Sequence, residues 1–408
     1  MIIIFFICYH KRIFKHYNLH MVLRFFCLVF FTTSVFANSQ SFEDFLSQVR
    51  TTAIEQGVSK MTIDKAFFEL TPNTDILKSD SSQAEFNQNF WHYVNKRVSN
   101  VRLSNGRESL KQNASLLNKT SEKYGVPAYV LVAFLGLESN YGNYMGNESL
   151  VRSLATLAYD PRRSGFFTKE LIAALKLMDK NTIPINAKGS WAGAMGAVQF
   201  MPTNVIAYGV DANNDGKVDL WNDKADIYAS AANFLKKLGW KKGEKWGREA
   251  KIPKNFDYRL TGLKNEKTVN EWAALGVLKG NGSSLPKSNF KSSLIVPMGH
   301  KGPAFLVYRN FDTIMGWNRS ILYALSVAYL SDRIKGGGKL SAKSIDEPLL
   351  SKENVMQIQN TLNLLGYDTG TPDGMAGPKT REATRMFQSD IGLVADGYVG
   401  YELFQVLQ

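Results

Sequence analysis

The feature that constrains the fold most is a long uncharged stretch, which reads VPAYVLVAFLGLESNYG over residues 126–142. Pro127 suits the first turn of a helix, where its missing N–H has no intrahelical partner in any case. Residues 128–137 carry no charged side chain, so this helix is apolar on every side and is expected to lie at the centre of the fold. Glu138 follows directly, and Asn140 is a stop signal two residues further on. The sequence therefore predicts a central buried helix that ends in a carboxyl group.

The position of Glu138 has two explanations. Burial disfavours the charged form of a carboxyl group and raises its pKa, which is what a general acid working near neutral pH requires. A structural role, in which Glu138 pairs with an arginine or caps a neighbouring loop, accounts for this placement equally well, because structural ion pairs also put carboxylates at such positions. The helix alone leaves both explanations open.

The first part of the chain is typical of a targeting segment rather than of a folded domain. A basic region that ends at Arg24 precedes a short apolar run, and Val35-Phe36-Ala37 is a small-residue cleavage pattern. The apolar run is too short to span a membrane. We therefore predict a signal peptide over residues 1–37, with Met21 as an alternative start, and an exported, soluble, periplasmic protein.

Cysteine and histidine are nearly absent after this leader. Both cysteines, Cys8 and Cys27, lie within it, so we expect a mature chain without a disulfide, a lipid-acceptor cysteine or a cysteine nucleophile. Of the five histidines only His92 and His300 follow Met21, which argues against a zinc peptidase and against a Ser-His-Asp hydrolase. The remaining options are chemistry by carboxyl groups and binding without chemistry.

The chain is basic, with a formal net charge of +13, which becomes +9 without the four basic residues of the leader. A basic exported protein suits an anionic polymer as its partner. Nucleic acid is disfavoured by the export signal and by the lack of a nucleic-acid-binding motif. We expect a monomer without an integral membrane span.

The spacing of apolar residues predicts a mainly helical domain over residues 38–335. Residues 41–125 are expected to be helical, and they include a helix from Leu110 to Tyr124 that leads into the central one. Further helices are expected over residues 166–178, 225–238 and 310–334. Residues 250–310 differ, because they contain four prolines and short apolar runs, and we interpret them as a small insertion of strands and a helix.

Two motifs after the central helix carry polar groups suited to a sugar ligand. Arg162 and Arg163 stand at the start of a predicted helix, where the dipole favours anions, so this pair is better suited to hold an anion or a polar sugar group. Residues 189–202 are rich in glycine and alanine and include Ser190, so their backbone can approach a ligand or another backbone closely. Gln199 is a lone polar side chain in apolar company and needs hydrogen-bond partners, which a sugar could supply.

Aromatic and amide groups also gather near the start of the last long helix, at Trp317, Asn318 and Tyr323. Such groups suit sugar rings, but packing in the core explains Trp317 and Tyr323 nearly as well. For Tyr93, in an apolar helical segment, a place in the core is the favoured explanation.

A loop that begins at Asp211 matches the start of an EF-hand calcium site. Oxygen-bearing side chains occupy positions one, three, five and nine, and Gly216 occupies position six. Position twelve is Asn222 instead of the usual glutamate, and Asp226 could close the site in its place. The expected ligands of a structural Ca²⁺ are Asp211, Asn213, Asp215, Lys217 and Asp226. The alternative is an Asx-rich turn that caps the following helix.

A short separate unit is expected over residues 351–408, after a flexible linker over residues 336–350 that starts with three glycines. The unit contains a short internal repeat, Asp373-Gly374 and Asp396-Gly397, and each pair marks a turn before a helix. At under sixty residues without a cysteine or a metal, it can be only marginally stable. Its expected core is Leu362, Leu364, Leu365, Phe387 and Leu393.

Taken together, these motifs resemble the MltB-type lytic transglycosylases of bacterial cell-wall metabolism. The resemblance covers residues 41–335 and rests on GLESNYG at 136–142, YDPRR at 159–163, the glycine-rich segment, the Asp211 loop and WNRS at 317–320. It implies a mainly α (α+β) fold, with a lysozyme-like helical domain and a small strand-containing insertion. Residues 351–408 resemble a three-helix peptidoglycan-binding domain.

The resemblance also implies roles for individual residues. Glu138 matches the catalytic acid/base, and the positions that line the glycan groove are matched by Tyr93, Arg162, Arg163, Ser190, Gln199, Asn318 and Tyr323. The implied activity is cleavage of the MurNAc–GlcNAc bond of peptidoglycan glycan strands with formation of 1,6-anhydro-MurNAc ends, for which no cofactor is required. The alternatives are a hydrolytic muramidase and a non-catalytic scaffold that binds the cell wall.

Overall fold

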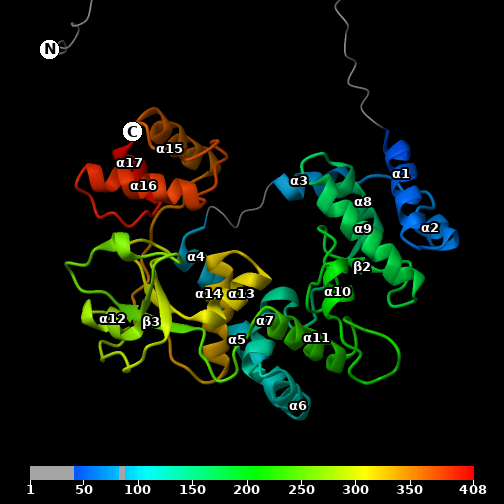
Figure 1. Ribbon diagram of the computed structural model, residues 1–408, viewed down its shortest axis with the longest axis horizontal. Helices are drawn as coiled ribbons and strands as arrows, with labels where there is room; N and C mark the ends of the chain where they lie inside the picture. Colours follow the sequence, from blue (N-terminus) through cyan, green and yellow to red (C-terminus); the bar gives the residue numbers. More distant parts are fainter. Residues whose placement is uncertain (1–40, 82–87) are drawn as a thin grey trace, which may run out of the picture. The chain divides into compact units, whose positions relative to one another are not determined.

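The computed structural model of the chain describes residues 41–81 and 88–408. The predicted signal peptide lies outside these ranges. Figure 1 shows a largely helical chain with one larger sheet, as the sequence predicts. Within the described ranges, none of the helices is both long and apolar enough to cross a membrane.

The described residues begin with a series of helices: α1 (Phe42–Glu55), α2 (Lys60–Ala66), α3 (Thr74–Ser81), α4 (Phe90–Arg97), α5 (Asn100–Gln112) and α6 (Ala114–Tyr124). Side-chain oxygens accept hydrogen bonds from the first-turn backbone of four of these helices, which satisfies N–H groups that have no partner within the helix. The capping residues are Ser41, Ser59, Asn89 and Ser99. The expected helical region is therefore confirmed.

The single helix expected from Leu110 to Tyr124 is wrong, because the chain breaks at Asn113. Nδ2 of Asn113 donates a hydrogen bond of 2.8 Å to the carbonyl oxygen of Ser109. Asparagine side chains compete in this way with the helical backbone, which favours a break at such a residue.

The central helix is α7 (Ala128–Ser139), and every residue from Val130 to Leu137 is buried. Helices α5, α6, α11 (Lys224–Lys237) and α14 (Ile321–Ile334) all contact it. It ends at Asn140, whose φ of 50° is left-handed and stops the helix. The prediction of a buried helix that ends beside Glu138 is confirmed.

A second group of helices follows: α8 (Leu150–Tyr159), α9 (Ser164–Asp179) and α10 (Pro202–Tyr208). Helix α9 packs against both α8 and α10. Two short strands, β1 (Glu148–Ser149) and β2 (Lys188–Gly189), pair antiparallel next to them. Helices α9 and α11 confirm the two helices expected here, each with slightly different ends.

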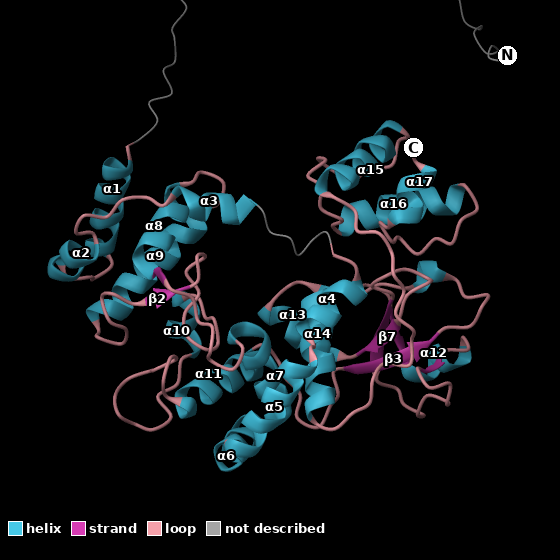
Figure 2. Cartoon of the chain, turned by 180° about the vertical axis from the view of Figure 1, so that it is seen from behind, coloured by secondary structure: helices cyan, strands magenta, loops and turns pink. Residues whose placement is uncertain are grey.

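The predicted insertion is a five-stranded antiparallel sheet with the strand order β4-β6-β7-β3-β5. Its elements are β3 (Gly247–Lys251), the 3₁₀ turn Tyr258–Leu260, β4 (Glu266–Thr268), α12 (Val269–Ala274), β5 (Leu278–Lys279), β6 (Lys291–Ile295) and β7 (Ala304–Val307). Trp272 on α12 is completely buried in a separate core with Leu294 and Leu306, and its indole N–H donates to the carbonyl of Ser292. Figure 2 shows α12 beside the strands of this sheet.

The single helix expected over residues 310–334 is wrong, because α13 (Arg309–Trp317) and α14 are separate. The side-chain oxygen of Asn318 accepts from the backbone N–H of Ser320, and the Ser320 hydroxyl oxygen accepts from that of Tyr323. The first bond competes with the helical hydrogen bonds and ends α13, and the second caps the start of α14. As a result, Tyr323 lies in the first turn of α14.

Residues 336–350 form no helix or strand, but the segment is held in place, which corrects the expectation of a flexible linker. The carboxylate of Glu249 accepts hydrogen bonds of 2.7 Å from the backbone N–H groups of Ser341 and Ala342. Further along, the carboxylate of Glu347 accepts from the hydroxyl of Tyr398 and the backbone N–H of Tyr401. Hydrogen bonds to residues that are distant in the sequence therefore hold this segment in place.

The last residues form the expected three-helix unit, α15 (Lys352–Leu364), α16 (Pro378–Asp390) and α17 (Tyr401–Val406). The repeated Asp-Gly pairs have a structural basis, because a buried glutamine holds each Asp-Gly turn. The amide oxygen of Gln359 accepts from the backbone N–H of Gly374, and that of Gln388 accepts from the N–H of Gly397. Each amide nitrogen donates to the aspartate of the same turn.

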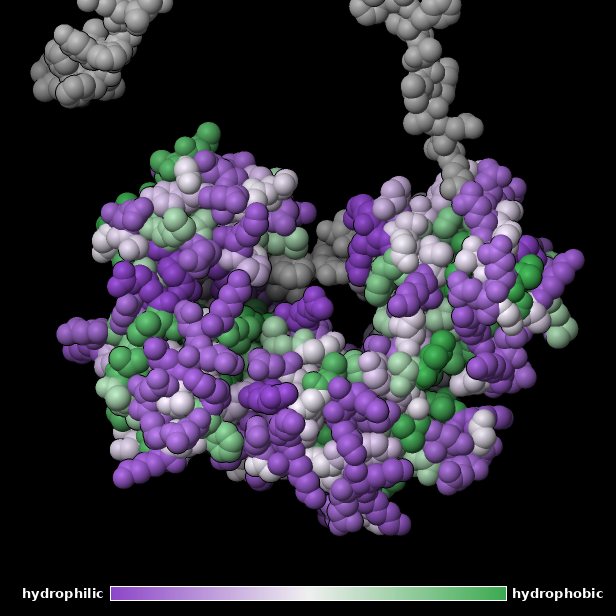
Figure 3. Space-filling view, in the orientation of Figure 1, coloured by the Kyte–Doolittle hydropathy of each residue, from purple (hydrophilic) through white to green (hydrophobic). Residues whose placement is uncertain are grey.

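The predicted core of this unit is only partly correct. Leu362 and Phe387 are buried, whereas Leu364, Leu365 and Leu393 are exposed. The exposed fraction of Leu364 is 88%. Leu364 and Leu365 lie at the end of α15, outside the part of the helix that packs on α16 and α17. The face of the chain in Figure 3 is mainly hydrophilic, with scattered hydrophobic side chains.

Candidate active site

Glu138 is the second-last residue of α7 and is half-buried between the buried Leu137 and Ser139. Its carboxylate accepts a hydrogen bond from the hydroxyl of Tyr323 on α14. Burial, followed by the charge of Glu138, raises the pKa of Tyr323 well above its ordinary value. Tyr323 therefore keeps its proton at neutral pH and can donate it in a hydrogen bond to an ionised Glu138. From the sequence, core packing explained Tyr323 nearly as well as a place in the site; Tyr323 is buried, and it also contacts the carboxylate.

The turn after Glu138 is fastened from two sides. Ser139 is buried, and its hydroxyl donates a 2.7 Å hydrogen bond to the carbonyl of Ala197 while accepting one from the backbone N–H of Gly142. The hydroxyl of Tyr141, itself at a left-handed φ of 63°, donates to the carbonyl of Arg102 on α5. Ser139 was not among the residues predicted for the site; its signal in the sequence was a lone hydroxyl beside Glu138. These bonds fix the end of α7 against the glycine-rich segment and against α5.

The glycines of that segment are required by close backbone approach. A Cβ at Gly189 would lie 2.4 Å from the carbonyl oxygen of Ala194. At Gly196, which has a φ of 66°, it would lie 2.4 Å from the carbonyl oxygen of Leu220. Ser190 holds the same turn, because its hydroxyl oxygen accepts from the backbone N–H of Ala194 at 3.0 Å.

Gln199 has its partners within the protein. At a left-handed φ of 50°, its amide nitrogen donates to the carbonyls of Gly196 at 2.8 Å and Met145 at 3.2 Å. The two bonds fix which end of the amide points away from the backbone. The amide oxygen has no donor within residues 41–81 and 88–408, so it is available to accept from a ligand.

Tyr93 lies close enough to Tyr323 to act on its pKa, and it is only 2% exposed. The guanidinium of Arg97, one turn later on α4, lies 5.2 Å from the centre of its ring. The positive charge of Arg97 acts to lower the pKa of Tyr323, against the larger effect of burial. Arg97 was not among the residues predicted for the site; its signal in the sequence was its i, i+4 spacing from Tyr93.

The arginine pair is anchored by its neighbours. Nε and Nη2 of Arg162 donate to the two carboxylate oxygens of Asp160 at 3.0 and 2.8 Å, and this pairing lowers the pKa of Asp160. The guanidinium of Arg163 lies 4.8 Å from the ring centre of Phe167. This ion pair fixes the direction of the Arg162 side chain.

The aromatic groups near Asn318 divide into two kinds. Trp317 belongs to the core, with its ring centre 4.4 Å from that of Phe134 and 5.0 Å from that of Phe234. The side-chain oxygen of Asn318 accepts from the backbone N–H of Ser320 in the break between α13 and α14. Of the aromatic residues near the start of α14, Tyr323 is the one that contacts Glu138.

The Asp211 loop is organised by its own oxygen atoms. The carboxylate of Asp211 accepts from the backbone N–H groups of Asp215 and Gly216, and Asp215 accepts from that of Lys217. The amide nitrogen of Asn213 donates to both Asp215 and Asp223. A donor held between two carboxylates occupies the kind of position that a cation prefers.

The structure places Asp226 differently from our expectation. Asp226 is 1% exposed, and its two carboxylate oxygens accept hydrogen bonds from the backbone N–H groups of Ala212 and Asp219. Its carboxylate therefore holds two parts of the loop together from the buried side. Asp223, which also caps α11, shares the amide nitrogen of Asn213 with Asp215. In the described residues, no three His, Cys, Asp or Glu side chains converge as a metal site. The donors are of the type that calcium prefers, but the loop is already closed by hydrogen bonds.

Comparison with known proteins assigns the two parts of the chain to families. Residues 41–332 match the transglycosylase SLT domain family, and residues 351–407 match a peptidoglycan-binding domain family. Membrane-bound lytic murein transglycosylase B of Escherichia coli (strain K12) is 33% identical over 251 residues, which are 59% of this chain and 66% of that protein. The match thus spans just under two thirds of that relative.

Solved structures agree with this assignment. SltB3 from Pseudomonas aeruginosa, in complex with NAG-anhNAM-pentapeptide, is 41% identical with a TM-score of 0.87, over 90% of this chain and 99% of that one. The Escherichia coli lytic transglycosylase Slt35, in complex with calcium, is 28% identical with a TM-score of 0.62, over 71% of this chain and 92% of that one. The chain therefore belongs to the transglycosylase SLT domain family, as an MltB-type lytic transglycosylase with a C-terminal peptidoglycan-binding domain.

Proposed function

We propose that this protein cleaves the MurNAc–GlcNAc bond of peptidoglycan and leaves 1,6-anhydro-MurNAc ends, with Glu138 as the catalytic acid and base. The observation that carries the proposal is the hydrogen bond between Glu138, at the end of the buried helix α7, and Tyr323. Further support comes from the similar SltB3 structure, whose ligand contains an anhydro sugar.

In the first half of the reaction, protonated Glu138 gives its proton to the oxygen of the scissile glycosidic bond. The bond between C1 of MurNAc and this oxygen breaks, GlcNAc leaves as the alcohol, and positive charge develops at C1. General acid catalysis of this kind contributes on the order of a hundredfold or more in rate. The hydroxyl of Tyr323 then donates to the carboxylate that Glu138 has become.

In the second half, the C6 hydroxyl of the same MurNAc attacks C1, and the Glu138 carboxylate takes the hydroxyl proton. The new O6–C1 bond closes the anhydro ring, and Glu138 is again protonated. Both reacting groups belong to one sugar, so the step is intramolecular and has the rate advantage of fixed proximity.

The other carboxylates near these motifs are poor candidates for activating water. Hydrolytic glycosidases commonly use two carboxyl groups. Asp160 is paired with Arg162 through two hydrogen bonds, and Glu170 is buried with its oxygens accepting from the backbone and hydroxyl of Thr203. Glu138 would then act without a second carboxyl group to activate water, which favours internal attack over hydrolysis.

The groove residues are proposed to hold the sugars around Glu138. The amide oxygen of Gln199 is suited to accept from a hydroxyl or acetamido N–H, because its nitrogen is occupied by the fold. Tyr93, Ser190 and Asn318 would border the glycan. Arg162 and Arg163 would hold carboxylates of the stem peptide, for which the fork of a guanidinium is well shaped.

We further propose that residues 1–37 direct the chain to the periplasm, that residues 38–335 carry the activity and that residues 351–408 bind peptidoglycan. The protein would act as a monomer. No cofactor takes part in the proposed chemistry. Ca²⁺ would be a structural ion at the Asp211 loop, held by oxygens of Asp211, Asn213 and Asp215, with Asp223 as the added ligand in place of Asp226.

Digestion of peptidoglycan in ¹⁸O-labelled water tests the reaction type. Internal attack leaves no label in the new sugar ends and gives products that are one water lighter than those of a hydrolase. Label in the new ends would show a hydrolytic muramidase. Absence of cleavage by the wild type in a zymogram would leave a scaffold that only binds the cell wall.

A further inference from the structure

We propose that a lysine-rich surface, where α7 begins and where α6, α11 and α14 end, docks on the anionic headgroups of a phospholipid membrane. This lysine surface consists of six exposed side chains: Lys123, Lys236, Lys241, Lys242, Lys245 and Lys335. Figure 1 shows α6 and α11 at the lower edge, and the same area of Figure 3 is mainly hydrophilic. The inference rests on the proposed export of the chain, which would place it beside membranes.

The end of α6 brings together three of these lysines, which come from distant parts of the sequence. The Nζ atoms of Lys123 and Lys236 lie 5.4 and 5.9 Å from the ring centre of Tyr124. Gly125 follows with a left-handed φ of 78°, and a Cβ there would lie 3.1 Å from that of Lys242. The side chain of Lys242 therefore packs against the same turn as the other two.

The lysine surface continues across the start of α7. Nζ of Lys335, directly after α14, lies 4.9 Å from the ring centre of Tyr129 in the first turn of α7. Burial raises the pKa of Asp332, and Lys245 and Lys335 both lie near enough to act against this effect. The carboxylate of Asp332 accepts a hydrogen bond from the indole N–H of Trp246 at 3.1 Å, so it is held within the fold beneath these two lysines.

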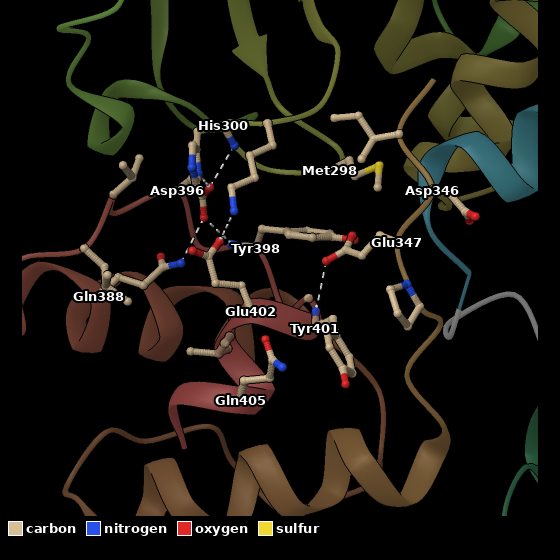
Figure 4. A pocket seen from close by; sticks show the side chains of 17 residues that line it. Met298, His300, Asp346, Glu347, Gln388, Asp396, Tyr398, Tyr401, Glu402 and Gln405 are labelled. Atoms are coloured by element: carbon tan, nitrogen blue, oxygen red, sulfur yellow. Dashed lines mark hydrogen bonds and ion pairs between the residues drawn. The ribbon is translucent and has the colours of Figure 1, made fainter. Parts of the chain in front are cut away.

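The charges of the lysine surface are not neutralised within the described part of the chain. None of its six lysines forms an ion pair with a carboxylate in residues 41–81 and 88–408. The acidic cavity beside the last helices differs, because Figure 4 shows Asp396 and Glu347 bonded to groups of the protein itself. Gathered like charges repel one another, and an anionic partner removes this cost.

A purely structural role explains only part of the arrangement. Lysines in the last turn of a helix interact favourably with its dipole, which accounts for Lys123 on α6 and Lys236 on α11. The effect falls off within that turn. Lys241, Lys242 and Lys245 come after the end of α11, so the dipole does not account for them.

The position and the chemistry of the lysine surface favour lipid headgroups over peptidoglycan. Tyr129 beside the lysines and Glu138 lie at opposite ends of α7, about 14 Å apart along the helix axis, so a partner bound here leaves Glu138 open to the glycan. Lysines are point charges that suit an array of lipid phosphates, whereas single carboxylates are better matched by the fork of an arginine. The exposed large hydrophobic side chains of the described residues lie elsewhere, so docking is electrostatic and without insertion.

The test is co-sedimentation of the exported chain, residues 38–408, with lipid vesicles. Vesicles of phosphatidylcholine alone are compared with vesicles of phosphatidylcholine and phosphatidylglycerol at about three to one. We expect binding only to the anionic vesicles. Raising the salt from about 0.1 M to about 1 M should abolish it, because the Debye length falls from ~10 Å to ~3 Å.

The triple variant Lys123→Gln/Lys236→Gln/Lys242→Gln should bind the anionic vesicles at least about tenfold more weakly. The matched control Lys60→Gln/Lys254→Gln/Lys287→Gln removes the same charge from exposed lysines elsewhere and should bind like its parent. Thermal melting verifies that both variants are folded. Lipid composition and salt are varied with the unchanged protein, so those two readouts do not depend on how the variants fold.

Equal binding to both kinds of vesicle, absence of binding, unchanged binding of the triple variant, or an equal loss in the control would each overturn the inference. If the triple variant instead loses pelleting with sacculi while its vesicle binding is unchanged, the surface belongs to peptidoglycan and the inference is again overturned. Cleavage plays no part in the experiment, so its failure leaves the proposed reaction intact, and failure of the labelling experiment leaves this result unaffected.

Discussion

The hydroxyl of Tyr323 donates a hydrogen bond to the carboxylate of Glu138, although the two residues are 185 positions apart. Two buried helices that pack against each other, α7 and α14, bring them together. Tyr323 is 5% exposed and its pKa is raised, first by burial, so it acts as a proton-bearing donor at neutral pH. The predictions for the catalytic centre follow from this contact.

Glu138→Gln should fold like the wild type and lose essentially all cleavage of peptidoglycan. The substitution keeps the shape of the side chain and removes its ability to donate a proton. Loss of a general acid costs on the order of a hundredfold or more in rate. A zymogram with peptidoglycan in the gel measures the activity, and Glu148→Gln, an exposed carboxylate, is the control. Residual activity within about tenfold of the wild type would exclude the role.

Tyr323→Phe should retain the fold and lose about tenfold to a hundredfold in kcat. The change removes a single hydrogen bond to a charged group, which is worth about 1.5–3 kcal/mol. The ring still packs 6.4 Å from that of Phe134, so thermal melting should change little. Steady-state kinetics on soluble glycan fragments give the measurement. A kcat equal to that of the wild type would show that the bond has no part in catalysis.

Calcium should raise the melting temperature through the Asp211 loop. At a free concentration ten times the dissociation constant, binding to the native state adds about 1.4 kcal/mol, which corresponds to about 2–4 °C. The double variant Asp211→Ala/Asp215→Ala should lose this response, whereas Asp390→Ala, an exposed residue elsewhere, should keep it. An unchanged response in the double variant would mean that the loop is only a turn.

Asp396 should make the melting temperature depend on pH in the acidic range. Burial alone would raise its pKa, but hydrogen bonds from His300, Tyr398 and Gln388 lower it below the ordinary value of 3.8. Because the folded pKa lies below the unfolded one, the carboxylate stabilises the fold above about pH 4, and this contribution is lost as the pH falls through the folded pKa.

Asp396→Asn should therefore cost about 1–3 kcal/mol near neutral pH, as expected for groups left without their charged partner. The difference in melting temperature from the wild type should shrink below about pH 4. Asp390→Asn, with an exposed side chain, serves as the control. A difference that stays constant from pH 7 to pH 3 would contradict the assignment.

A chain that ends at Gly338 should keep its turnover on soluble glycan fragments and lose activity on intact sacculi. Residues 351–408 are expected to hold the enzyme on its polymer and raise its local concentration there. Pelleting with sacculi measures binding, and thermal melting verifies that the shortened chain is folded. Equal pelleting of the full-length and shortened proteins would refute a binding role for the last three helices.

Local patterns in the sequence were sufficient to predict much of this structure. The run without charges before Glu138 identifies α7 as the central helix, because a helix that is apolar on every side must be buried. The prolines and short apolar runs identify the sheet insertion, and the two Asp-Gly pairs identify the turns of the last unit. In each case the residues that carry the signal lie close together along the chain.

Only the tertiary structure decided which distant groups meet. The contact of Tyr323 with Glu138, the docking of residues 336–350 on Glu249 and the bracing role of Asp226 depend on contacts between segments far apart in sequence or on a side chain's direction within its loop. The breaks at Asn113 and Asn318 depend on side chains that compete with the helical backbone. Apolar periodicity records how much of a helix is buried, but it does not record which partner buries it or where a polar side chain points.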